Sequence, residues 1–147
     1  MIMDKMEFSD AQEITASTAT DSTNVLDLGL ASTGSDVGSG TPIWVVGRVN
    51  TTFVDAAPSA ANTWRVALQH SASEGSGFVD VFAGPAANKV SSIAANNDMT
   101  KGADLLTQPL PTDLLRYLKV QITPAAASGP SAGKIDAFLT LNAPLNT

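Results

Sequence analysis

A β-strand is predicted by the ten residues Leu114-Leu115-Arg116-Tyr117-Leu118-Lys119-Val120-Gln121-Ile122-Thr123. Apolar residues at positions 118, 120 and 122 alternate with Tyr117, Lys119 and Gln121 between them. Because successive side chains of a strand point to opposite faces, this alternation puts the apolar residues on one face and the polar residues on the other. The sequence therefore predicts a sheet with one face packed against a core and the other in water.

Short strands of the same kind are expected along most of the chain. The breaks between them are rich in Gly, Pro, Ser and Asn, which tolerate turn geometry. Many short strands with frequent turns are typical of a β-sandwich, and the lack of cysteine excludes the Cys–Trp–Cys pattern of immunoglobulin domains, so a jelly roll is favoured. The expected strands are Ile14–Thr20, Val25–Leu30, Ile43–Asn50, Trp64–His70, Phe78–Ala83, Val90–Ala94, Ala103–Thr107, Leu115–Thr123 and Ile135–Leu141.

We expect a single all-β domain. A chain of 147 residues is long enough to bury a core without disulfides or metals, and it contains no internal repeat. The β-sandwich is assigned to residues 14–147. Residues 1–13 are expected to form either an N-terminal arm or an edge strand, because their pattern is neither a clean strand nor a clean helix.

The opening segment and three aromatic residues are the candidate partner-binding positions. Met3, Met6 and Phe8 are interleaved with charged residues, and side chains of this kind can fill pockets on a neighbouring protein. A chain without residues 1–8 is expected to remain folded but to bind a partner less well. Trp44, Trp64 and Tyr117 are expected to pack in or near the core. For Trp44 and Tyr117 the alternative is an exposed contact surface, since Trp and Tyr are enriched at interfaces.

The composition argues against nucleic acid and membranes as partners. The net charge is −6, and the eight Lys and Arg residues are scattered rather than gathered into the basic stripe that phosphate binding requires. No apolar run approaches the roughly 20 residues that span a bilayer. The first residues contain charges and no continuous apolar segment, so a secretion signal is not expected and the protein is expected to be made in a cytoplasm.

No catalytic, cofactor or metal site is expected. His70 is the only histidine, and zinc sites need several His or Cys ligands. The chain has no Gly-x-Ser-x-Gly nucleophile elbow and no phosphate-binding glycine motif. Since His70 falls at the end of an expected strand, it is expected to make a structural hydrogen bond. We therefore expect a protein that is not an enzyme.

Six stretches of the chain resemble a known family, and they occur in the same order. They are Met1–Gln12, Thr23–Gly29, Pro42–Val49, Trp64–Ser71, Leu110–Val120 and Gly133–Leu141. The family is that of the capsid cement proteins of tailed bacteriophages, and the similarity is greatest to the cement proteins of Bordetella podophages. The opening segment and Arg116-Tyr117-Leu118 are the most specific parts, whereas residues 86–107 match nothing in the family.

The resemblance implies a jelly-roll protein on the outside of an icosahedral capsid. Its expected partners are the major capsid protein and further copies of itself in a dimer or trimer, and its expected location is the virion, after assembly in the bacterial cytoplasm. The alternative is a β-sandwich module that binds carbohydrate or a receptor in a phage tail or adhesin. In that case Trp44 or Tyr117 would be exposed platforms for stacking on a sugar.

Overall fold

Alternating strands build the whole of the described structure. This computed structural model describes residues 2–29, 42–55, 63–83, 88–89, 99–125 and 130–141, and in these residues the protein is all-β. None of the described residues form a helix that is long and apolar enough to cross a membrane. The strands are β1 (Ile2–Glu13), β2 (Thr20–Asp21), β3 (Leu26–Asp27), β4 (Trp44–Asp55), β5 (Thr63–Ser71), β6 (Val79–Ala83), β7 (Asn88–Lys89), β8 (Asp104–Pro109), β9 (Tyr117–Ala125) and β10 (Pro130–Thr140).

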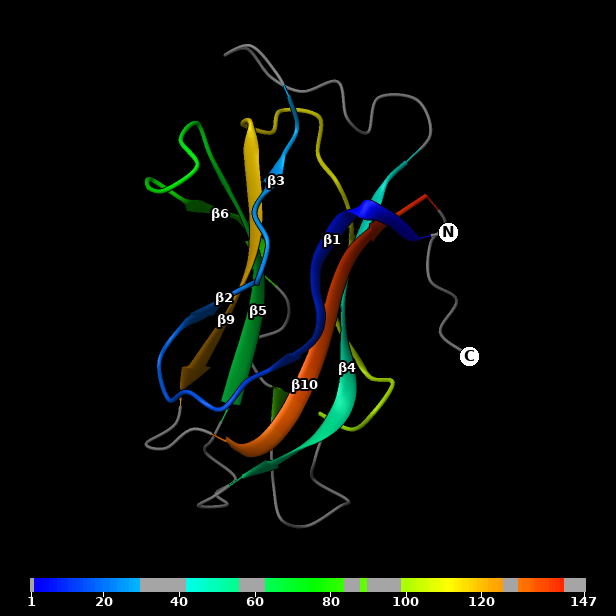
Figure 1. Cartoon of the computed structure of the whole chain (residues 1–147), viewed down its shortest axis with the longest axis vertical. Coiled ribbons are helices and arrows are strands. Elements are labelled where there is room, and N and C mark those ends of the chain that lie inside the picture. The colour runs from blue at the N-terminus through cyan, green and yellow to red at the C-terminus, as the bar shows by residue number, and fades with distance from the viewer. Residues whose placement is uncertain are drawn as a thin grey trace.

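Two antiparallel sheets form the layers of a sandwich (Figure 1). Sheet A has the order β1-β10-β4-β8. Sheet B has the order β2-β9-β5-β6, with β3 also paired to β9 and β7 also paired to β5. Both sheets therefore combine strands from distant parts of the chain.

The strand order is that of a jelly roll, which confirms the predicted fold class. Counting β2 with β3, and β6 with β7, reduces the ten strands to eight. The first of these then pairs with the last, the second with the seventh, the third with the sixth and the fourth with the fifth. This is the pairing of a long hairpin folded back on itself. Pairs β10–β4 and β5–β9 then close the hairpin into two sheets.

The core lies between the sheets and consists of the inward faces of the long strands. On β9 the residues Leu118, Val120 and Ile122 are buried, while Tyr117 and Lys119 on the other face remain partly exposed. The predicted alternation of this strand is therefore confirmed. Trp64 is fully buried, as expected for a core residue.

The start of the chain differs from the expected strand boundaries. The strand predicted at Ile14–Thr20 is wrong, because residues 14–19 connect β1 to β2 and the long strand lies earlier, at Ile2–Glu13. Register shifts interrupt the pairing of β1 with β10 at three places. Each extra residue reverses the face to which the next side chain points, so the strand shows no regular alternation in the sequence. The strand expected at 90–94 lies outside the described residues.

Candidate functional site

Several candidate partner-binding residues meet at one end of the sandwich. In sheet A, Ile2 at the start of β1 faces Thr140 at the end of β10, and Thr140 faces Trp44 at the start of β4. In sheet B, Tyr117 begins β9, and neighbouring register pairs place Val79 at the start of β6 close by. In Figure 1 these strand ends lie in the upper half of the sandwich, those of sheet A on the right and those of sheet B on the left. We call this region the Trp44 end and define it by Trp44, Tyr117, Val79 and Leu141.

The Trp44 end carries two of the three exposed large hydrophobic residues in the described part of the chain. Val79 is 54% exposed and Leu141 is 42% exposed, whereas Val54, at 52%, lies toward the opposite end of β4. Exposed apolar side chains beside Trp, Tyr and Arg resemble the composition of protein contact surfaces. This end is therefore the best candidate for a contact with a partner.

Neither aromatic candidate at this end is an open platform. Trp44 and Tyr117 are both half-buried. The guanidinium carbon of Arg116 lies 5.1 Å from the centroid of the Tyr117 ring, in the geometry of a cation–π contact. A sugar ring would have to displace this cation to stack on that face of Tyr117, so the arrangement does not favour the carbohydrate-binding alternative.

The structure corrects the expectation for Phe8. Its side chain is fully buried in the core of its own chain, so in this fold it does not fill a pocket on a partner. Phe8 and its neighbour Ser9 are both buried. In a regular strand with one face in water, one of two successive side chains would be exposed. The register shift between Glu7 and Ser9 explains why both are buried here. Met6 is half-buried and packs against the core, whereas the side chain of Met3 lies outside what the structure describes.

Residues 2–13 do not project as a free arm, because they form an edge strand of sheet A. The first half of this strand is loosely matched to β10. Ile2 faces Thr140 and Glu7 faces Phe138, so the four residues from Met3 to Met6 lie opposite Leu139 alone. Backbone that exceeds its partner in this way bends out of the sheet. The start of β1 is therefore the most irregularly paired part of the opening segment.

The second half of β1 is fastened by Asp136 on β10. The backbone N–H of Ala11 donates to Oδ1 of Asp136 at 2.7 Å, and the Asn50 amide donates to both carboxylate oxygens at 3.2 and 3.0 Å. Ala11 has a φ of 45°, which is unfavourable for a residue with a Cβ. The carboxylate therefore stabilises a strained bulge and fixes how β1 joins the sheet.

Replacing Asp136 with alanine is expected to lower the free energy of unfolding by about 1.5–3 kcal/mol, because a charged acceptor of the Ala11 amide is lost. The measurement is urea unfolding followed by far-UV circular dichroism. Asp136→Asn is the matched control, since its amide oxygen can still accept from Ala11, and it is expected to cost less. Equal stability of Asp136→Ala and the wild type would contradict this role.

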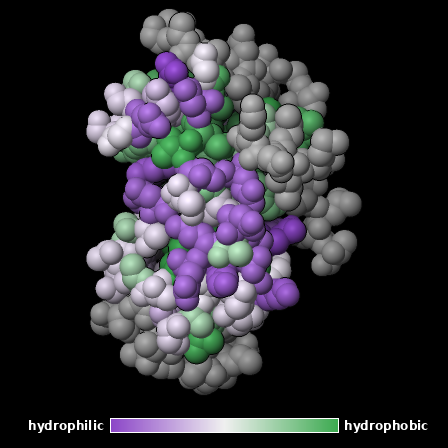
Figure 2. Space-filling model, viewed as in Figure 1, coloured by the Kyte–Doolittle hydropathy of each residue, from purple (hydrophilic) through white to green (hydrophobic). Residues whose placement is uncertain are grey.

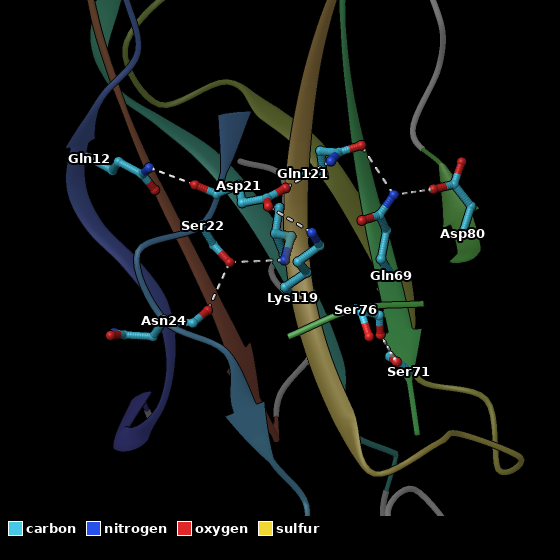
Figure 3. Close-up of polar contacts among 11 residues, drawn as sticks. Gln12, Asp21, Ser22, Asn24, Gln69, Ser71, Ser76, Asp80, Lys119 and Gln121 are labelled. Carbon is cyan, nitrogen blue, oxygen red and sulfur yellow. Dashed lines mark hydrogen bonds and ion pairs between the residues drawn. The ribbon is translucent and has the colours of Figure 1, made fainter. Parts of the chain in front are cut away.

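The outer face of sheet B carries a row of side chains joined by hydrogen bonds across four strands (Figure 3). On one side, the Asp21 carboxylate accepts from Lys119 Nζ at 2.7 Å and from Gln121 Nε2 at 2.8 Å. The Gln69 amide then donates to Gln121 Oε1 at 3.1 Å and to Asp80 Oδ1 at 2.8 Å. We call these residues the polar ladder. Its groups bind one another, which suits a face turned toward water.

Most described cations are held in ion pairs with aspartates. The pairs are Arg48–Asp104, Arg65–Asp80, Arg116–Asp27 and Lys119–Asp21. The Asp104 carboxylate raises the pKa of Arg48. Partial burial raises the pKa of Asp21, but the hydrogen bonds from Lys119 and Gln121 outweigh it and bring the pKa below its ordinary value. Because these cations are neutralised in place, they do not form a basic surface.

The Asp27–Arg116 pair is expected to make stability depend on pH in acid. Hydrogen bonds from Arg116 and from the Gly29 N–H lower the pKa of Asp27 from 3.8 to about 2. A lowered pKa in the folded state means that the stabilisation is complete above about pH 4 and is lost as the pH falls toward 2. Thermal unfolding between pH 6 and 2 should show Asp27→Asn to be slightly less stable than the wild type at pH 6 and equal to it at pH 2.

Arg116→Gln is the matched variant for this prediction, because it removes the same pair from the other side. It should show the same pH dependence as Asp27→Asn. The effect is small, since both side chains are more than 40% exposed and water screens the pair. A difference from the wild type that persists at pH 2 would show that another interaction is responsible.

His70 makes the structural hydrogen bond that was predicted for it. Its Nδ1 atom accepts from the backbone N–H of Leu115 at 3.2 Å, near the end of β5. Among the residues that the structure describes, no three His, Cys, Asp or Glu side chains are grouped so that they could hold a metal ion.

Sequence reasoning missed the polar ladder and the Asp136 fastening. The alternation on β5 and β9 does place Gln69, Lys119 and Gln121 on outward faces, so part of the ladder had a signal in the sequence. Which strands lie next to each other has no local signal, because Asp21 and Gln121 are 100 residues apart and Ala11 and Asp136 are 125 apart.

The surface that faces the viewer in Figure 2 is mostly hydrophilic over β1 and β2, with a smaller hydrophobic area beside β3. In a comparison with protein families, the family model described as Bbp16 matches residues 8–139, which includes most of the described strands. No curated protein matches the chain.

Proposed function

Since the chain belongs to the Bbp16 family, whose model matches it over residues 8–139, we propose that it is a structural protein of a bacteriophage particle. The match is the observation that carries the proposal, because it spans both sheets from Phe8 to Leu139. The family name fits a Bordetella phage protein, in line with the resemblance of six stretches of the chain to phage cement proteins.

More specifically, we propose that the protein binds the outer surface of an icosahedral capsid and cements neighbouring subunits of the major capsid protein. Its other partner would be a second or third copy of itself. Several weak contacts made at once by such an oligomer give high avidity without a large interface. A protein that binds the assembled shell and not its separated subunits stabilises the shell by mass action against the pressure of packaged DNA. The net charge of −6 is compatible with a position away from that DNA.

We place the contact with the shell at the Trp44 end. Leu141 and Val79 are exposed at the same end of the sandwich as Trp44, Tyr117 and the start of β1, and the polar ladder on sheet B offers no comparable apolar surface. Leu141→Asp and Val79→Asp are expected to weaken binding to purified shells at least tenfold, because each puts a charge into an apolar contact. Val54→Asp is the matched control, since it changes an equally exposed valine toward the other end of β4. Equal binding by all three variants would overturn this placement.

The start of β1 is expected to contribute to the same contact. Deleting residues 1–5 removes backbone that exceeds its partner in the sheet and leaves Met6, Phe8 and the Asp136 fastening in place. The shortened chain is expected to unfold at nearly the wild-type temperature but to bind shells less tightly. Cosedimentation with empty capsids measures binding, and calorimetry provides the control for folding. Unchanged cosedimentation would remove these residues from the proposed contact.

The number of copies in purified virions tests the cement function directly. Quantitative mass spectrometry should find a fixed ratio to the major capsid protein, of the same order as one to one. A handful of copies per virion would place the protein in the tail and favour the receptor-binding alternative. Complete absence from virions would overturn the proposal of a structural role.

A further inference from the structure

Beyond the structural role, we propose that His70 is a protonation-dependent fastener of the connection between β8 and β9, residues 110–116. Its Nδ1 atom accepts the Leu115 N–H at 3.2 Å, across 45 residues of sequence. A neutral imidazole has one nitrogen that accepts and one that donates, whereas the imidazolium has two donors. Protonation of His70 therefore replaces the hydrogen bond with two N–H groups that face each other.

The connection is held at its two ends by backbone hydrogen bonds that do not involve His70. Near its start, the Leu110 N–H donates to the Ile43 carbonyl at 2.8 Å, and at its end the Leu28 N–H donates to the Arg116 carbonyl at 2.8 Å. The Leu114 side chain is buried in the core between these points. Loss of the bond to His70 therefore loosens the middle of the connection while the sandwich stays folded.

The charged groups around His70 lie toward solvent. On the neighbouring strands, Asp80 and Lys119 belong to the outer face of sheet B, whereas His70 belongs to the opposite face of β5. Arg116 pairs with Asp27 and is exposed, and so are Glu74 in the turn after β5 and Asp113 in the connection. Water screens these charges, so the direct contact between the imidazole and the Leu115 amide dominates the response.

Loosening of the connection between β8 and β9 would also affect the Trp44 end. Residues 115 and 116 lead directly into Tyr117, and the Arg116 guanidinium contacts the Tyr117 ring. Protonation of the imidazole is therefore expected to loosen the segment that positions Tyr117. This holds whichever partner binds there, so its failure would leave the proposed capsid function untouched.

Nuclear magnetic resonance on the full chain tests the proposal, because a single histidine gives an unambiguous imidazole signal. At pH 8 the imidazole nitrogen shifts should show a proton on Nε2 and none on Nδ1. After correction for the intrinsic exchange rate, hydrogen-exchange protection of the Leu115 amide should fall about three- to tenfold from pH 8 to 5. The Leu118 and Val120 amides in the centre of sheet B should keep their protection and report on the fold.

His70→Gln is the matched variant, since a glutamine oxygen can accept a hydrogen bond but does not titrate. Its Leu115 protection is expected not to change between pH 8 and 5. A proton on Nδ1 of the wild type at pH 8, or an equal loss of protection in His70→Gln, would overturn the proposal. If that variant does not fold, a measurement on the wild type tests the proposal instead. The chemical shift of the Leu115 amide should change with pH at the same midpoint as the imidazole signal. A different midpoint would overturn the proposal.

Discussion

Replacing Gly133 with alanine is expected to destabilise the protein by about 3–5 kcal/mol. A Cβ on Gly133 would overlap two carbon atoms of the Phe53 ring, far inside van der Waals contact. Phe53 is buried, so its ring has no free space into which to move. Gly133 also has a φ of 151°, a conformation that residues with a side chain rarely adopt.

Thermal unfolding measures this effect, with Gly75→Ala as the control. A Cβ on Gly75 meets no atom within 4 Å, so that variant is expected to stay within about 0.5 kcal/mol of the wild type. The smaller side chain in Phe53→Leu should make room, so Gly133→Ala should cost less in that background than in the wild type. If Gly133→Ala lowered stability equally in the wild type and in Phe53→Leu, the Phe53 ring would not be the cause of the destabilisation.

Phe8→Ala is expected to lower the free energy of unfolding by about 3–5 kcal/mol, because the side chain is fully buried in the core. The cost combines the apolar surface that is no longer removed from water with the cavity left between the sheets. Chemical denaturation with tryptophan fluorescence measures it, since the two tryptophans include the buried Trp64.

Asp10→Ala is the control for this prediction, because Asp10 is exposed on the same strand. It is expected to change stability by less than about 0.5 kcal/mol. If Phe8→Ala were as stable as Asp10→Ala, this result would contradict the packing of β1 against the core of its own chain. The same reasoning revises the expectation that a chain without residues 1–8 stays folded, because that deletion removes a core residue.

The fold class and several strand faces could be predicted from the sequence. Alternation identified the buried residues of β9 and of the first part of β5, because each faces a core on one side and water on the other. The end of β5 close to His70 was also predictable from local pattern. These features depend on the residue types at adjacent positions, so the amino-acid sequence is sufficient to predict them.

The opening segment was not predictable in the same way. Its register shifts break the alternation, and Ala11 takes a conformation that its residue type does not favour. The Asp136 carboxylate, more than a hundred residues away, accepts from the Ala11 amide in that bulge, and the pairing with β10 makes the segment an edge strand. The choice between a free arm and an edge strand was therefore made by a long-range contact.

The sequence by itself determined an acidic, cysteine-free, all-β protein whose strands have one apolar face. The tertiary structure alone decided how those strands pair, that Phe8 belongs to the core, and that Trp44 and Tyr117 begin strands at one end of the sandwich. The reason is physical. Alternation depends on the two-residue repeat of a single strand, whereas strand order and the grouping of distant side chains depend on the backbone pairing of segments far apart in the chain.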